Sequence, residues 1–214
     1  MLAQSVGKNS FILAAFAIVT AGLLAFTFLG TKDKIAAAER RAAQKALTEI
    51  ISLDRHNNDM LEDTWNIPAE LLEALGLNEE AQIHIARQDE RVIAMVIPSI
   101  APDGYSGDIK LIIGINADET LAGVRVLAHK ETPGLGDKVD INKDDWILNF
   151  NEKSLNTPAA EHWKVKKDGG EFDQFTGATI TPRAVVKRVK QTLEFYSQHK
   201  NDILETETLE QTEQ

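Results

Sequence analysis

An uncharged segment of 20 residues runs from Phe11 to Gly30 and constrains the fold of this chain more than any other feature. A helix of about 20 apolar residues matches the hydrocarbon core of a bilayer. Its only polar side chains, Thr20 and Thr27, can hydrogen-bond to their own helix backbone. A cleavable signal peptide is the competing interpretation, but the segment is longer than the apolar region of such peptides. We therefore expect a short N-terminal segment (1–10) and a single, uncleaved transmembrane anchor (11–30).

Basic residues around the anchor leave its orientation open. Lys8 precedes the anchor, whereas Lys32, Lys34, Arg40, Arg41 and Lys45 follow it. The positive-inside rule would keep the C-terminal part of the chain in the cytoplasm, but the rule is weak for long translocated domains. Charge alone therefore does not decide the side of the membrane.

The segment after the anchor has the pattern of a helical stalk over residues 31–56. Apolar residues recur at helical spacing in this segment: Ile35, Ala38, Ala42, Ala46, Ile50 and Leu53. The polar sequence His56–Asp59 is expected to break the helix. A second, short helix is predicted from Pro68 to Leu75, with Gly76 at its end.

The periodicity then changes to two, which is typical of strands. Four strands are predicted, over 82–86, 91–97, 108–115 and 121–128. Their short connections favour an antiparallel sheet, and the absence of a Gly-x-Gly-x-x-Gly motif argues against a Rossmann fold. We expect an α+β domain over 57–200 in which Trp146, Ile147, Phe150 and Trp163 pack a helix and a strand (162–166) against the sheet.

A short turn leading into a helix is predicted from Asp173 to Pro182. Thr181 suits the N-cap, Pro182 suits the first helical position, and Val185, Val186, Val189, Leu193 and Tyr196 follow at helical spacing. Thr179 would then lie at the positive end of the helix, where a phosphate is favoured. By spacing alone, the segment is also typical of an ordinary turn. The helix is expected to end near His199, before a disordered acidic tail (201–214).

Another loop, from His129 to Lys138, follows the last predicted strand and is rich in Gly, Pro and charge. Scaffolds commonly present ligand sites on such loops. Gly134 and Gly136 would let the backbone approach a flat ligand, and Leu135 would cover its apolar face. An ordinary surface turn is the alternative interpretation.

Composition excludes several classes of site. The chain has no cysteine, which excludes disulfides and thiolate-held iron–sulfur clusters. Its five histidines show no metal-binding spacing, so we predict no metal site. The formal net charge of −10 argues against nucleic acid as a partner.

The residues Asp173 to Thr179 match the pattern Asp-x-x-(Ser/Thr)-Gly-Ala-Thr. This pattern resembles the flavinylation motif of the family that contains the G subunit of the Rnf (Rsx) electron transport complex and the C subunit of the sodium-pumping NADH:quinone oxidoreductase. Tyr105–Gly107 and the Glu131–Gly136 loop add to the resemblance, which covers nearly the whole chain. It implies FMN attached covalently, through its phosphate, to Thr179. The other cofactor-binding residues expected are Asp173, Thr176, Gly177, Ala178, Glu131, Thr132, Gly134, Leu135 and Gly136.

The resemblance also implies a role and partners. The chain would be an electron-carrying component, without catalytic residues of its own, of an ion-translocating ferredoxin:NAD oxidoreductase. Its partners would be the other membrane and iron–sulfur or flavin subunits, and a Mg-dependent flavin transferase would attach the FMN. The domain would lie on the periplasmic side of the bacterial inner membrane. The C subunit of the sodium-pumping enzyme and a cofactor-free assembly subunit are the alternatives.

Overall fold

The computed structural model describes residues 2–212, which form two compact units divided after Ala43. The first unit consists of the longer part of helix α1 (Leu2–Ile50). Its segment Leu13–Lys32 has a mean hydropathy of 2.2 and is long and apolar enough to cross a membrane. The large apolar side chains described there are exposed, as lipid-facing side chains would be. Thr20 and Thr27 donate to the carbonyls of Phe16 and Leu23 (2.9 and 2.7 Å), as predicted.

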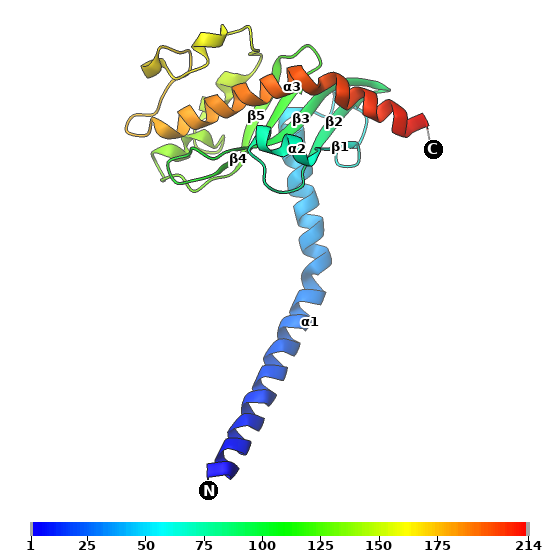
Figure 1. Cartoon of the computed structure of the whole chain (residues 1–214), viewed down its shortest axis with the longest axis vertical. Coiled ribbons are helices and arrows are strands. Elements are labelled where there is room, and N and C mark those ends of the chain that lie inside the picture. The colour runs from blue at the N-terminus through cyan, green and yellow to red at the C-terminus, as the bar shows by residue number, and fades with distance from the viewer. Residues whose placement is uncertain (1, 213–214) are drawn as a thin grey trace. The chain divides into compact units, whose positions relative to one another are not determined.

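The second unit is built on a five-stranded antiparallel sheet (Figure 1). The strands lie side by side in the order β1-β2-β3-β4-β5, which is also their order in the chain. This confirms the α+β fold and the four predicted strands. The extra strand, β1, has only three residues, too few to show an alternating pattern. The strands are β1 (Thr64–Asn66), β2 (Gln82–Gln88), β3 (Arg91–Ala101), β4 (Ile109–Asn116) and β5 (Leu121–Ala128).

One face of the sheet packs against helix α3 (Ile180–Thr212), which crosses the strands (Figure 1). Ile97, Ile113 and Val124 are paired across β3, β4 and β5 and are fully buried on this face. Burying each such side chain contributes about 1.5–3 kcal/mol. The apolar residues predicted along the helix form its buried side: Val185, Val186, Val189, Leu193 and Tyr196.

The opposite face of the sheet packs against the last turn of α1. Leu47, Ile50 and Ile51 are buried there in a separate apolar cluster. A Cβ at Gly114 would lie 2.2 Å from Cγ2 of Ile50, so only glycine allows the helix to approach β4 this closely. The sheet is therefore covered on both faces, and the C-terminal turn of α1 is part of the folded domain.

Helix α3 runs from one end of the sheet to the other. Near its start, Thr181 contacts Glu131, which follows β5, and Lys187 pairs with Asp103 between β3 and β4. About halfway along the helix, Ser197 donates to Glu119 in the β4–β5 turn at 3.3 Å. The start of α3 is therefore held at the end of the sheet where β3, β5 and their following loops meet.

Several predicted boundaries differ from the structure. Helix α1 ends at Ile50 instead of His56, because Ile50 and Ile51 turn into the core while Leu53 is exposed. Residues 162–166 form no strand; within the described chain, Val165 makes only an isolated bridge with Phe172. Helix α3 extends to Thr212, past His199 and into the predicted acidic tail, since Ile203 is buried against the core.

The short helix before the sheet is confirmed in outline. It consists of α2 and one 3-10 turn, and Gly76 ends it with a left-handed φ of 70°. The predicted helix around Trp146 is a 3-10 helix in which Trp146, Ile147 and Phe150 are buried. The short helices are α2 (Ala69–Leu72), η1 (Glu73–Leu75), η2 (Gly136–Val139), η3 (Asp145–Phe150), η4 (Ala160–His162) and η5 (Lys166–Asp168).

Candidate functional site

A tight turn places Thr179 immediately before α3. The backbone N–H of Ala178 donates to the carbonyl of Phe175 at 3.1 Å, and Gly177 has a φ of +80°, which a turn of this kind requires of its third residue. The carbonyl of Thr179 accepts from the N–H of Arg183 at 3.3 Å, which starts the helical hydrogen-bond pattern. The Thr179 side chain is partly exposed, and its hydroxyl makes no hydrogen bond with any residue that the structure describes.

A cavity of about 200 Å³ lies beside this turn. It brings together seven of the ten predicted cofactor-binding residues, namely Glu131, Thr132, Leu135, Gly136, Gly177, Ala178 and Thr179. Tyr105, Ile180 and Thr181 complete the lining. Segments that are far apart in the chain therefore meet at one place, as expected if the two loops and the turn share one ligand.

The remaining three predicted residues lie outside the cavity lining. Asp173 fixes the start of the turn, because its carboxylate pairs with Lys166 at 2.8 Å and its carbonyl accepts from the indole N–H of Trp146 at 2.8 Å. Thr176 is exposed at the tip of the turn. Gly134 has a φ of +77° with open space where a Cβ would stand, so it shapes its loop and does not pack against a neighbour.

Glu131 joins the three segments around the cavity. Its side chain is only 4% exposed, and its two oxygens accept from the backbone N–H of Ser106 (2.9 Å) and from the hydroxyl of Thr181. Hydrogen bonds to an ionised acceptor are stronger than neutral ones. The prediction that Thr181 is the N-cap is therefore wrong: α3 begins at Ile180, two residues before the predicted first helical residue Pro182, and the Thr181 hydroxyl donates to Glu131.

Gly136 has no room for a side chain beside this carboxylate. A Cβ there would lie 2.5 Å from Oε2 of Glu131 and 2.8 Å from Oγ1 of Thr181. Real Cβ atoms do not approach other atoms this closely. The contact between Glu131 and Thr181 therefore requires a glycine at position 136. The spacing of the sequence could not show this, because Glu131 and Thr181 are 50 positions apart.

The rim of the cavity is apolar and open to solvent. Tyr105, Leu135 and Ile180 are 69%, 43% and 45% exposed, which is unusual for large apolar side chains gathered at one place. A flat aromatic ring could lie against them, while the first N–H groups of α3 could receive a phosphate. The lining residues therefore fit FMN. Ligand sites commonly measure about 300–1,000 Å³, so part of an FMN would extend outside this cavity.

Comparison with known proteins places these features in a family. The model of the FMN-binding domain matches residues 104–194, and that of the RnfG N-terminal region matches residues 1–50. A protein of Pseudoalteromonas atlantica, named as the G subunit of an ion-translocating oxidoreductase complex, is 45% identical over 200 residues, covering 94% of this chain and 92% of that protein. This chain belongs to the RnfG family. Proteins of the same name from Vibrio vulnificus (46%, 94% of each chain) and Shewanella amazonensis (44%, 91% of this chain and 89% of the other) are similar to it.

Membership of the RnfG family resolves one alternative that the motif left open. The matched names and the N-terminal region indicate the G subunit of the Rnf type, not the C subunit of the sodium-pumping enzyme. The FMN-binding domain also contains every residue that lines the cavity at Thr179. The cavity beside the sequence motif thus lies inside the matched domain.

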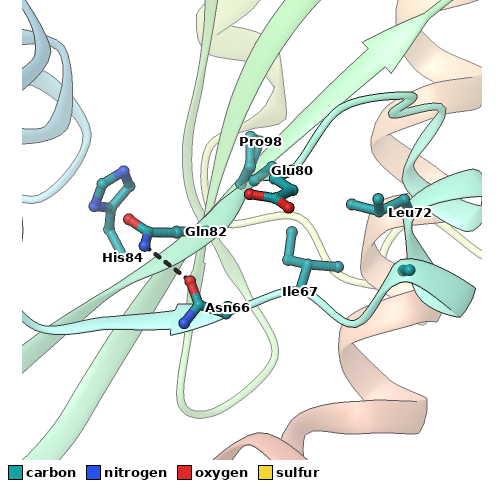
Figure 2. A pocket seen from close by; sticks show the side chains of 9 residues that line it. Asn66, Ile67, Leu72, Glu80, Gln82, His84 and Pro98 are labelled. Carbon is teal, nitrogen blue, oxygen red and sulfur yellow. Dashed lines mark hydrogen bonds between the residues drawn. The ribbon is translucent and has the colours of Figure 1, made fainter.

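A larger cavity, of about 750 Å³, lies at the β1 edge of the sheet (Figure 2). Its lining residues precede the FMN-binding domain in the chain, and they include no residue of the motif. Figure 2 shows that two of its polar side chains pair with each other, since Gln82 donates to Asn66 at 2.8 Å. The cavity beside Thr179 is therefore the candidate site because of the chemistry of its lining residues, although the other cavity is larger.

His84 in this larger cavity leads to a prediction on pH. Burial lowers the pKa of His84 from its ordinary value of 6.5, although a hydrogen bond to the carbonyl of Met60 opposes the effect. Because the unfolded chain then binds the proton more readily, this contribution to stability is present above pH 6.5 and is lost as the pH falls through the folded-state pKa. The thermal midpoint of the wild type should fall more steeply below about pH 6.5 than that of His84→Gln. An equally steep fall in both proteins, with the exposed His162→Gln as control, would contradict this.

Proposed function

We propose that this chain carries FMN as a phosphoester on Thr179 and relays electrons within an ion-translocating ferredoxin:NAD oxidoreductase complex. One observation carries the proposal: the motif's last threonine, whose hydroxyl bonds to no described residue, lines a cavity at the start of α3, inside the FMN-binding domain. Bound FMN would supply one- and two-electron redox chemistry. The relatives named as G subunits of an ion-translocating oxidoreductase complex support the same role.

The residues around Thr179 each have a defined part in holding the cofactor. The first N–H groups of α3 would receive the phosphate, and the exposed side chains of Tyr105, Leu135 and Ile180 would contact the ring. Gly177 sets the turn, and Asp173 anchors it through Lys166 and Trp146. Thr132 and Ala178 complete the wall of the cavity.

The attachment reaction needs a separate flavin transferase. A threonine hydroxyl is a poor nucleophile without a base. The carboxylate that lines the cavity, Glu131, is buried and already accepts from Ser106 and Thr181. Among the residues described, no other carboxylate lines this cavity. The chain therefore supplies the acceptor hydroxyl and its setting, and the transferase supplies the catalysis.

The test of this function is whether the denatured chain retains flavin fluorescence after co-expression with a flavin transferase. Retention would show a covalent flavin. A band without fluorescence would favour the alternative of a cofactor-free assembly subunit. The other membrane and iron–sulfur or flavin subunits of the complex are the proposed partners in electron transfer.

We also propose that Leu13–Lys32 crosses the bacterial inner membrane once and places the domain on the periplasmic side. The exposed apolar side chains of this segment support the span, and the resemblance supports the side. A reporter that is active only after export, fused after residue 200, should be active. Activity of the complementary cytoplasmic reporter would show instead that the basic residues after the anchor determine the orientation.

A further inference from the structure

A groove of about 440 Å³ lies between α3 and the segment from Trp163 to Asp168. Its floor is apolar and consists of the buried side chains of Trp163, Val165 and Val186. Its rim carries four basic side chains and two acidic ones. The basic residues are Lys164, Arg183, Lys187 and Lys190, and the acidic residues are Asp168 and Glu194. This excess of positive charge is local. Residues 160–190 contain seven Lys and Arg and four Asp and Glu, whereas the net charge of the whole chain is −10.

The basic stripe starts at the acceptor threonine. Arg183 is four positions after Thr179, and Lys187 and Lys190 follow at four and three positions, which places all of them along one side of a helix. The hydrogen bond from the N–H of Arg183 to the carbonyl of Thr179 shows that the first two are one turn apart. A protein that reaches the Thr179 hydroxyl from solvent along α3 therefore meets this stripe.

Among the described residues, one charged and one polar group of the groove have no partner. Arg183 pairs with Asp168, Lys187 with Asp103 and Lys190 with Glu194 (2.5, 2.5 and 3.7 Å), but the amino group of Lys164 has no ion-pair partner in this part of the chain. The side-chain oxygen of Gln191 is buried in the groove without a hydrogen-bond partner in this part of the chain. Buried polar groups are rarely left unpaired, so a binding partner is a natural source of the missing contacts.

We propose that this groove is the docking surface for an acidic face of the flavin transferase that modifies Thr179. The inference rests on the proposed function. In the reaction, Oγ1 of Thr179 forms a bond to the FMN phosphorus of FAD while the pyrophosphate bond breaks; AMP leaves with the bridging oxygen, and the hydroxyl proton passes to the transferase or to water. Nothing is oxidised or reduced. The enzyme must bring its active site to Thr179, so its surface must lie against the adjacent groove.

Docking by charge predicts a specific kinetic effect. Complementary charge raises the rate of encounter and holds the acceptor, whereas the chemical step depends on the transferase. Replacing Lys164 with glutamate and Lys187 with glutamine should therefore raise the KM for this chain about fivefold or more, with kcat unchanged within about twofold. In about 1 M salt, where exposed charges are screened, the difference should largely disappear.

The experiment uses the full chain in phosphatidylcholine vesicles, purified flavin transferase, FAD and Mg²⁺, with initial rates of covalent loading as the readout. Arg91→Glu is the matched control, because Arg91 is exposed at the β2–β3 hairpin, at the other end of the sheet. Circular dichroism melts check that each variant is folded. An unchanged KM in the folded Lys164→Glu, Lys187→Gln protein, or an equal rise in Arg91→Glu, would overturn the proposal.

Two further outcomes distinguish a failure of the docking proposal from a failure of the proposed function. If the wild type takes up no flavin at all, the proposed function fails and the docking proposal fails with it. If the wild type is loaded but the lysine variants differ from it only when the vesicles contain anionic phosphatidylglycerol, the stripe contacts the membrane surface and the docking proposal alone is overturned.

Discussion

Replacing Thr179 with valine is expected to abolish covalent flavin completely and to leave the fold intact. Valine keeps the shape of the side chain but removes the oxygen that forms the ester. The Thr179 hydroxyl makes no hydrogen bond to any described residue, and the side chain is partly exposed, so the stability of the domain should change by no more than about 0.5 kcal/mol. The measurement is the flavin fluorescence of the denatured band after co-expression with the transferase.

Two neighbouring threonines provide controls for this result. Thr181 is fully buried and bonded to Glu131, so it is not accessible to a transferase. Thr176 is exposed at the tip of the turn and is the rival acceptor. Thr176→Val should retain covalent flavin. If Thr179→Val kept the fluorescence and Thr176→Val lost it, the acceptor would be Thr176.

A Cβ at Gly136 is expected to cost about 3 kcal/mol of the free energy of unfolding, far more than one at Gly134. In Gly136→Ala the methyl group would displace the Glu131 carboxylate and weaken its charged hydrogen bonds, each of which is worth about 1.5–3 kcal/mol. In Gly134→Ala the methyl group meets open space, and only the positive φ of +77° opposes it, at about 1 kcal/mol. Denaturant unfolding of the full chain in detergent measures both.

The same pair of variants connects the Glu131 contacts to cofactor attachment. Because Glu131 holds the start of α3 beside the Ser106 loop, Gly136→Ala should also reduce the fraction of chain that takes up flavin. Gly134→Ala should be loaded like the wild type. Equal stabilities for the two variants would show that the close contacts at Gly136 relax without loss, and would remove Glu131 from its central place in the site.

Local patterns in the sequence predicted much of this fold because the corresponding forces are local. The anchor follows from 20 uncharged residues, and the four longer strands follow from alternation of apolar residues along each one. Gly76 ends its helix in the left-handed conformation that glycine favours. Strand β1 was missed because three residues carry no periodicity, and the end of α1 was misplaced because its last turn is set by contact with Gly114, far along the chain.

In the candidate site, too, local patterns could be predicted from the sequence and contacts between distant residues could not. The motif identified Thr179 and its turn from adjacent residues, and the glycine-rich loop was found from its composition. The pairs that hold these parts together could not be found, since Glu131 lies 50 positions from Thr181 and Trp146 lies 27 positions from Asp173. The assignment of Thr181 as an N-cap failed for this reason: a distant carboxylate competes successfully for its hydroxyl.

The most direct measurement of the central claim is mass spectrometry of the tryptic peptide Asp168–Arg183 from chain co-expressed with the transferase. This peptide contains Thr176, Thr179 and Thr181 and has no internal Lys or Arg. We predict that it is heavier than the unmodified peptide by one FMN less one water, and that its fragment ions place the addition on Thr179. An unmodified peptide, or an addition on Thr176 or Thr181, would contradict the account.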